Sequence, residues 1–480
     1  MTRVLDARRS DVCVAAVAHQ GGSWNWANRE KGRKRQNCSL ALRCYKRRGG
    51  LGMKLDHVDV RLADGYELIL PRMAKVRQRR SRPRLEDPVA FIQASMDRIL
   101  DAAQLSGKRI AVTAGSRNIA QIRLILRTVI QKLSSWGAKP FIVPAMGSHG
   151  GADAAGQRIV LAGYGITEEE MGVPVLSSME VVRIATLEDG MPVYCDKIAY
   201  EADGIVVVNR VKPHTDFKGD HESGLVKMMG IGLGKHKGAT ELHSRGFERM
   251  PSLLAQVGEA FIRNAPIAFG VATVENAFDE LMDVEILQPE HFLSREKELL
   301  EKAKANIGKL PVSSIDVLII DEIGKDISGS GMDPNVTGIP GSGLTTGFVA
   351  PPIQKIVVLG LTKNAHGNGT GIGLADVSTI RCVNQIDWGI TYTNCITATV
   401  PGIGKMPMVL NTDKEALVVA LRTCACVSPS IARIVRIKNT LDLAQIEVSE
   451  PYLRELEHQD DVEILSEPEP FRFTSDGWLV

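Results

Sequence analysis

The stretch that decides the fold runs from Ile205 to Gly230 and reads IVVVNRVKPHTDFKGDHESGLVKMMG. Its first four residues form a continuous apolar run, which is typical of a parallel strand that is buried on both faces. The run is followed by a loop rich in titratable side chains. Open parallel sheets bind ligands at the carboxyl ends of their strands, which is where this loop begins. The stretch therefore predicts an α/β protein with a functional loop after this strand.

Strand and helix patterns alternate on both sides of this stretch. Such βαβ alternation favours a doubly wound, mostly parallel sheet. A second α/β unit opens near Pro311. The expected strands are 109–114, 140–145, 203–209, 315–320 and 353–359, and the expected helices are 119–134, 152–162, 251–263 and 289–309.

The length of 480 residues exceeds that of one ordinary core, so two α/β domains with mostly parallel sheets are expected. We predict a disordered basic extension over 1–52 and an N-terminal cofactor-binding and catalytic domain over 53–308. A C-terminal α/β domain is predicted over 309–445, and a tail over 446–480 is expected to pack back on the N-terminal domain. The active site is expected in the cleft between the two domains.

Charge and cysteine content restrict the class of protein. The first 52 residues carry 12 Lys and Arg against 3 Asp and Glu, although the whole chain has a net charge of only +2. The rest of the chain is therefore mildly acidic, which does not favour a nucleic-acid partner. No apolar run reaches the length of a membrane span. Eight cysteines without a CxxC pair exclude common zinc and iron–sulfur motifs and favour a cytoplasmic location.

Polar residues follow three of the predicted strands. Arg117 comes after the first strand, His149 lies in a glycine-rich turn after the second, and His214 closes the third. The fork of arginine donors suits a carboxylate or phosphate, and histidine suits acid–base chemistry near neutral pH. Each residue alone is more often structural, as a loop histidine bonded to a carbonyl or an arginine in a surface salt bridge. Because all three emerge at one sheet edge, together they predict a shared site.

The segment between Lys227 and His243 contains several glycines, at positions 230, 232, 234 and 238. Such a run can form a loop that cradles a phosphate through its backbone N–H groups. The spacing matches neither a P-loop nor a dinucleotide-binding fingerprint, so this interpretation is weakly specified.

Five motifs follow one another in the first part of the chain: Gly-Ser-Arg at 115–117, Gly-Ser-His-Gly at 147–150, His214, Ser-Gly-Leu-Val-Lys at 223–227 and His-Ser at 243–244. The second domain contributes a Gly-rich stretch at 366–376. This ordered set resembles the nickel-pincer lactate racemase family, and the resemblance covers roughly residues 55–445.

The resemblance implies a nickel-pincer nucleotide, a pyridinium mononucleotide with thioamide and thiocarboxylate arms that holds nickel through two sulfurs and a ring carbon. Lys227 matches the lysine that is attached covalently to this cofactor. His243 matches the protein ligand that completes a square-planar nickel site. Ser116, Gly150 and Ser244 match positions beside the cofactor.

The resemblance also implies the reaction, the inversion of a secondary alcohol carbon by hydride transfer. Side chains alone cannot break an unactivated C–H bond, so the cofactor accepts the hydride. His149 and His214 match the paired acid–base histidines, and Arg117 matches an arginine near the substrate. Lys325 is the candidate for the substrate-binding lysine of the second domain.

Two departures from the family concern substrate contacts. The segment between His214 and Lys227 is longer than in the lactate enzyme, and the surroundings of Lys325 match loosely. We therefore expect a racemase or epimerase that acts on a 2-hydroxy acid other than lactate, or on a sugar acid. The expected partners are this small substrate and the proteins that make the cofactor, with neither nucleic acid nor membrane, and a homodimer is one expected assembly.

Two other classes of function remain open on the sequence alone. A hydrolytic metalloenzyme would place His149, His214 and His243 around zinc, although no HxH or HxxxH spacing supports such a site. A non-catalytic protein that binds a small ligand would also place polar residues at strand ends.

Overall fold

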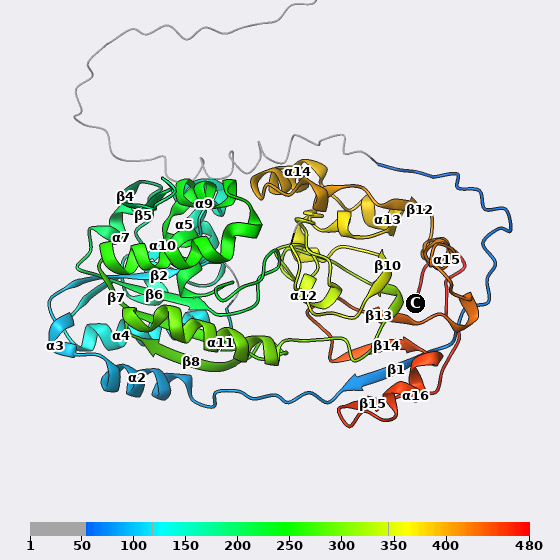
Figure 1. Ribbon diagram of the computed structural model, residues 1–480, viewed down its shortest axis with the longest axis horizontal. Helices are drawn as coiled ribbons and strands as arrows, with labels where there is room; N and C mark the ends of the chain where they lie inside the picture. Colours follow the sequence, from blue (N-terminus) through cyan, green and yellow to red (C-terminus); the bar gives the residue numbers. More distant parts are fainter. Residues whose placement is uncertain (1–53, 117–118, 344) are drawn as a thin grey trace, which may run out of the picture. The chain divides into compact units, whose positions relative to one another are not determined.

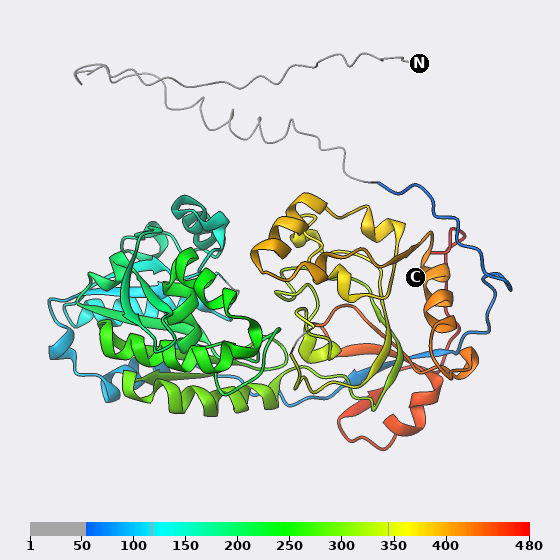
Figure 2. The same ribbon diagram turned by 45° about the horizontal axis from the view of Figure 1, so that its top comes forward.

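The computed structural model describes residues 54–116, 119–343 and 345–480 (Figures 1 and 2). The predicted basic extension over 1–52 and Arg117 lie outside the described residues. Two sheets with flanking helices organise the described chain, and most of their neighbouring strands are parallel. The predicted α/β fold class is therefore confirmed.

The first sheet has five strands in the order β3-β2-β6-β7-β8. The first four are parallel to their neighbours, and β8 returns antiparallel to β7. The strand that opens the deciding stretch, β6, is the central one. The bounds are Arg109–Ala114 for β2, Lys139–Pro144 for β3, Gly204–Arg210 for β6, Ile267–Glu275 for β7 and Leu281–Leu287 for β8.

Both faces of this sheet are buried, as the continuous apolar run of β6 predicts. Ile205 and Val207 belong to one hydrophobic cluster, and Val206 and Val208 belong to the other. Successive side chains of a strand point to opposite faces, so a buried strand needs apolar residues at every position. One face packs against α2 (Pro88–Ile99), α4 (Ile122–Ser135) and α5 (Ala154–Gly163), and the other against α9 (Lys235–Ser244), α10 (Met250–Asn264) and α11 (Phe292–Asn306).

The second sheet has eight strands in the order β12-β11-β10-β9-β13-β14-β1-β15. Strands β12 to β13 are parallel, and the last three are antiparallel to their neighbours. The strands are β1 (Met73–Gln78), β9 (Ile315–Ile320), β10 (Ile353–Val358), β11 (Val377–Thr379), β12 (Met408–Leu410), β13 (Ile434–Ile437), β14 (Gln445–Ser449) and β15 (Val462–Ile464). The helices that pack on them are α13 (Ile380–Val383), α14 (Trp388–Thr397), α15 (Asp413–Arg422) and α16 (Leu453–Leu456).

The two ends of the described chain meet in this second sheet. Strand β1 pairs with β14, with Met73 opposite Ser449, and also with β15. The tail over 446–480 extends the second sheet, where it pairs with β1, a strand from the range predicted for the N-terminal domain; its packing on that domain stays a prediction. The open edge of β13 carries backbone groups that need partners, and β14 supplies them. The domain bounds at 53–308 and 309–445 stay a prediction.

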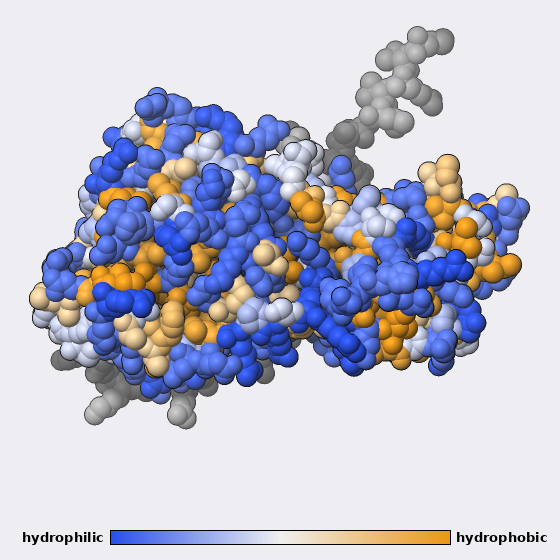
Figure 3. Space-filling model, turned by 60° about the horizontal axis from the view of Figure 1, so that its bottom comes forward, coloured by the Kyte–Doolittle hydropathy of each residue, from blue (hydrophilic) through white to orange (hydrophobic). Residues whose placement is uncertain are grey.

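Shorter elements complete the described chain. Strands β4 (Val181–Thr186) and β5 (Pro192–Asp196) form a separate hairpin. The helices α3 (Ala102–Leu105), α6 (Glu168–Met171), α7 (Lys197–Tyr200), α8 (Leu225–Lys227) and α12 (Pro334–Thr337) have one turn or less. No helix in the described ranges is long and apolar enough to cross a membrane. On the face drawn in Figure 3, hydrophobic residues form small patches among hydrophilic ones, as on most protein surfaces.

Close packing against β7 makes one glycine of the first sheet hard to replace. A Cβ atom at Gly270 would lie 2.5 Å from Leu225 Cδ1 and 2.7 Å from the Phe292 ring. We expect Gly270→Ala to lower the free energy of unfolding by about 1–3 kcal/mol through overpacking. The matched control is Gly163→Ala at the end of α5, where a Cβ atom would meet nothing within 4 Å. Urea unfolding of both variants measures the difference, and equal stabilities would contradict this packing.

Candidate functional site

The carboxyl ends of β2, β3 and β6 lie along one edge of the first sheet. Ala114 of β2 pairs with Pro144 of β3, and Val112 of β2 pairs with Val206 of β6. Because the three strands are parallel, the residues that follow them leave the sheet on the same side. Ser116, His149 and His214 follow these three strands, whereas Arg117, which the sequence also places at this edge, lies outside the described residues.

The turn that carries His149 depends on glycine. Gly147 and Gly150 have φ values of +60° and +68°, a region that L side chains rarely adopt. A Cβ atom at Gly150 would lie 2.7 Å from the backbone nitrogen of Gln157. The exposed His149 ring contacts Ser116 through Nδ1 and Oγ. The structure therefore brings the predicted residues His149, Gly150 and Ser116 together.

His214 is held by its own loop on three sides. Its backbone N–H donates to Glu222 at 2.7 Å, and its Nδ1 accepts from the N–H of Asp216 at 3.0 Å. Its ring stacks on Phe217 with the centroids 4.0 Å apart. Because Nδ1 accepts a hydrogen bond, the neutral imidazole carries its proton on Nε2.

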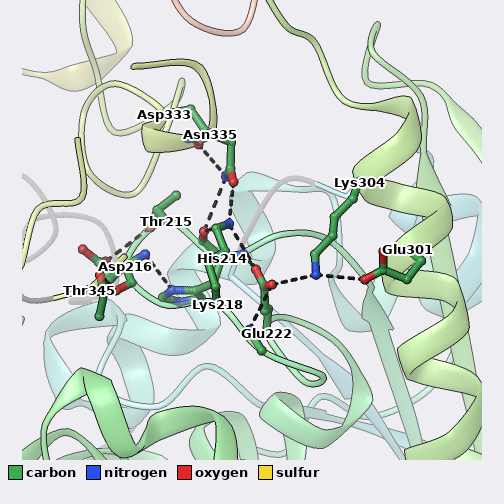
Figure 4. A network of polar contacts seen from close by, with 11 residues as sticks. His214, Thr215, Asp216, Lys218, Glu222, Glu301, Lys304, Asp333, Asn335 and Thr345 are labelled. Carbon is green, nitrogen blue, oxygen red and sulfur yellow. Dashed lines mark hydrogen bonds and ion pairs between the residues drawn. The ribbon is translucent and has the colours of Figure 1, made fainter. Parts of the chain in front are cut away.

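The carboxylate of Glu222 holds this loop together through hydrogen bonds and ion pairs. Its side chain is fully buried, and it accepts hydrogen bonds from the backbone N–H groups of His214 and Gly219. It also pairs with Lys218 at 3.2 Å and Lys304 at 3.1 Å (Figure 4). A buried carboxylate is costly unless it is paired and hydrogen-bonded, and these four donors satisfy it.

Residues that follow β9 reach the same loop. Lys218 Nζ donates to His214 O at 2.9 Å and also contacts Asn335 Oδ1, while Asn335 Nδ2 donates to His214 O at 3.4 Å (Figure 4). The hydroxyl of Thr345 donates to Asp216 O at 2.6 Å. The loop of His214 is therefore tied to the 333–345 segment of the chain.

Lys227 and His243 lie close enough for the lysine charge to act on the imidazole. Burial, and then the charge of Lys227, lower the pKa of His243 to about 4. His243 is therefore neutral at neutral pH, which is the form that binds metals. Phe247 lies 5.9 Å from the His243 ring and 6.5 Å from the Phe217 ring. Aromatic contacts thus connect His243 with the loop of His214.

Asp216 is a site residue that the prediction of individual roles missed. Burial raises the pKa of its carboxyl, and the charges of Lys227 and Lys325 oppose that rise. Its Oδ1 atom is buried without a hydrogen-bond partner. The charges of two predicted site lysines therefore act on Asp216. Its position two residues after His214 in a loop rich in charge was the only signal in the sequence.

Other predicted residues make ordinary structural contacts. Ser244 is exposed, and its hydroxyl donates to Glu241 O at 2.8 Å within α9. Lys325 Nζ donates to Gly329 O at 2.7 Å within its own turn. These contacts neither require nor exclude a ligand.

The phosphate-cradle interpretation of the glycines after Lys227 needs correction. Gly230 and Gly232 lie in a π-helical segment, Met228–Leu233, Gly234 lies between this segment and α9, and Gly238 lies in α9. A Cβ atom at Gly232 would lie 2.8 Å from Ala145 O, and one at Gly234 would overlap Gly230 O. The glycines therefore allow close backbone packing instead of exposing an anion-binding loop.

A protein-built metal cluster finds no support in this geometry. Within residues 54–116, 119–343 and 345–480, no three His, Cys, Asp or Glu side chains gather in a way that could hold a metal ion. These described ranges include His149, His214 and His243, so the structure does not support a zinc site built from these three histidines. A cofactor that needs a single protein ligand for its metal is compatible with the residues present.

Residues 67–252 match the family model described as the lactate racemase N-terminal domain. A protein from Thermotoga maritima of known structure is 14% identical, covering 73% of this chain and 93% of that one with a TM-score of 0.45. The lactate racemase apoprotein from Thermoanaerobacterium thermosaccharolyticum is 14% identical, covering 71% and 80% with a TM-score of 0.43. These weak structural likenesses add nothing to the family match. No curated protein is significantly similar in sequence.

Removal of the Glu222 charge alone is expected to be strongly destabilising, because Lys218 and Lys304 would lose their shared carboxylate. Glu222→Gln keeps the shape of the side chain but leaves Lys218 and Lys304 facing an amide. We expect a loss of about 3–5 kcal/mol, as when one partner of a buried ion pair is removed. Glu301→Gln is the control, because Glu301 pairs with the same Lys304 while its side chain is 67% exposed. Urea unfolding should show less than about 0.5 kcal/mol for the control, and a similar loss in both variants would contradict the buried role.

The pKa of His243 predicts how the metal-free protein responds to acid. An unfolded histidine takes up a proton below its usual pKa near 6.5, whereas folded His243 stays neutral down to about 4. Acidification through this window therefore favours the unfolded state, and the stability contribution is fully present above the window.

We expect wild type to lose roughly 2 kcal/mol more than His243→Leu between pH 7 and pH 4.5. Urea unfolding at the two pH values measures this difference. The exposed His236 supplies the control variant, His236→Leu, which should follow wild type. An equal loss in wild type and His243→Leu would contradict the lowered pKa.

Proposed function

We propose, from the match of residues 67–252 to the family model described as the lactate racemase N-terminal domain, that the protein is a racemase or epimerase. Its substrate would be a 2-hydroxy acid or a sugar acid, inverted at a secondary alcohol carbon. Its cofactor would be a nickel-pincer nucleotide attached to Lys227. The grouping of Lys227, His243 and the loop of His214 is the observation that supports this proposal most directly.

The residues present fit such a cofactor. The imidazole of His243 lies within electrostatic reach of Lys227, and its ring contacts Phe247. One candidate nickel ligand and one candidate attachment point are therefore close together. Asp216 adds a buried carboxylate oxygen that lacks a partner in the protein. An unpartnered buried acceptor needs a donor, and a bound group can supply it. When bound, the cofactor supplies the hydride acceptor that side chains lack.

The two histidines would accept the proton from the substrate hydroxyl and return it. His214 presents Nε2–H, because its Nδ1 accepts from the N–H of Asp216. His149 contacts Ser116 through Nδ1, so its Nε2 faces away from that contact and can take a proton when Ser116 accepts. One imidazole would therefore act as base while the other donates to oxygen, and the roles exchange with the direction of reaction.

Substrate binding would involve Arg117, which lies outside the described residues, and Lys325. Both carry the positive charge that a substrate carboxylate needs. Asp216 acts on Lys325 electrostatically and would compete with a carboxylate for it. The surroundings of Lys325 are thus where this chain would differ from an enzyme for a simple acid.

The decisive experiment combines metal analysis, intact mass and isotope retention on protein from cells that make the cofactor. Wild type should hold about one nickel and a covalent adduct on Lys227. Lys227→Ala should lose the adduct, whereas His243→Ala should keep the adduct and lose nickel. His236→Ala, an exposed histidine on the same helix, is the matched control and should retain both.

Racemisation of single enantiomers of 2-hydroxy acids and sugar acids in D2O tests the reaction itself. The carbon-bound hydrogen should be retained, because it travels as hydride. His149→Ala and His214→Ala should each suppress both directions, since every turnover uses both groups. Deuterium at the inverted carbon would indicate a carbanion mechanism. A protein without nickel and without an adduct would contradict the proposed cofactor.

A further inference from the structure

A fully buried lysine, Lys235, is connected with the turn of His149 through Gln157 and takes no part in the proposed reaction. Lys235 is 0% exposed, and its Nζ lies 3.0 Å from Asp196 Oδ2, which is also fully buried. The same ammonium donates to Gln157 Oε1 at 3.1 Å and to the carbonyl of Pro144. An ammonium without partners would be very costly at this depth, and here two hydrogen-bond acceptors and one carboxylate surround the nitrogen.

The backbone of Lys235 also has an unusual conformation. Its φ of +54° lies in the left-handed region, which is uncommon for residues other than glycine. The residue stands where the π-helical segment Met228–Leu233 gives way to α9, the helix that carries His243 near its other end. Such strain persists only where surrounding contacts hold it, and it is concentrated at functional sites.

Gln157 transmits the position of Lys235 to the turn of His149. Its Nε2 donates to the carbonyl of Gly147 at 2.9 Å and to the carbonyl of His149 at 3.2 Å. Its Oε1 is the atom that accepts from Lys235, so the ammonium fixes which end of the amide faces the turn. Gln157 is itself fully buried in α5. One amide therefore holds both sides of the His149 turn.

Asp196 gives the arrangement its second anchor. Its Oδ1 accepts from Ala199 N at 2.9 Å and so caps α7, while its Oδ2 faces Lys235. Pro144 is the last residue of β3, directly before the His149 turn. Lys235, at the start of α9, thus contacts Pro144 at the end of β3, Gln157 of α5 and Asp196 at the end of β5.

We propose that Lys235 is a positioning residue that sets His149 relative to the helix of His243, acting through Gln157 and anchored by Asp196. The proposal rests on the proposed function, because it assigns His149 a proton-transfer role. A buried ion pair is often replaceable by apolar residues without loss of stability. What apolar residues cannot supply is directed hydrogen bonds to the carbonyls of the turn.

Two variants separate positioning from stability. Gln157→Leu removes the amide donors but leaves Lys235 with Asp196 and Pro144. The double variant Lys235→Met with Asp196→Asn removes the buried charges and keeps the cap on Ala199. Gln104→Leu is the control, because that amide contacts only the exposed Asp101.

The first readout is backbone hydrogen exchange of the holoenzyme across residues 145–152, which does not depend on catalysis. The turn contains the bonds Gly147 N–H to Gly232 O and Ala152 N–H to Ser148 O. Both variants should exchange at least about tenfold faster here, with α10 unchanged, since local opening is governed by local contacts. Unchanged exchange over 145–152 would overturn the proposal.

The second readout is catalytic. In both variants kcat should fall by roughly 10- to 100-fold, the cost of misplacing a catalytic group by about 1 Å. The solvent isotope effect on kcat should rise as proton transfer becomes limiting, while nickel content and the Lys227 adduct stay at wild-type levels. Faster exchange with wild-type kcat and isotope effect would also overturn the proposal. Absence of nickel and activity in wild type would instead count against the proposed function, and the exchange result would still decide whether Lys235 positions the turn.

Discussion

The parallel pairing of β2, β3 and β6 is the constraint on which the candidate site depends. Hydrogen bonding in register brings the three carboxyl ends to one edge, so Ser116, His149 and His214 can share a site although they are distant in sequence. Both faces of the sheet are buried, and successive side chains of β6 belong to two different hydrophobic clusters. Hydrophobic burial thus determines where the polar residues stand.

Each histidine-bearing loop is supported from inside by a lysine. Lys218 donates to the carbonyl of His214 and is neutralised by Glu222. Lys235 reaches the carbonyl of His149 through an amide and is neutralised by Asp196. Buried ion pairs add little net stability, but their hydrogen bonds have direction. Both loops therefore rely on charge for orientation and on apolar contacts for stability.

The departures of this chain from the lactate racemase pattern are concentrated beside His214. The segment before Lys227 supplies Asp216, Lys218 and Glu222; Glu222 pairs with Lys218, and the charges of Lys227 and Lys325 act on Asp216. Under the proposed function, Lys227 and His243 would serve the cofactor, and the residues beside His214 would serve a substrate that differs from lactate.

The sequence by itself determined the α/β class, the strands of the first sheet that lead to the site, and the family resemblance, which the match over 67–252 confirms. These features depend on local signals, namely apolar runs and short motifs, which can be read directly from a sequence. Tertiary structure alone decided that β1 and the tail share a sheet, that the glycines after Lys227 pack inside helices, and that Lys235 is buried. Such features depend on partners that are distant in the sequence or on backbone conformation, and neither leaves a periodic trace in the sequence.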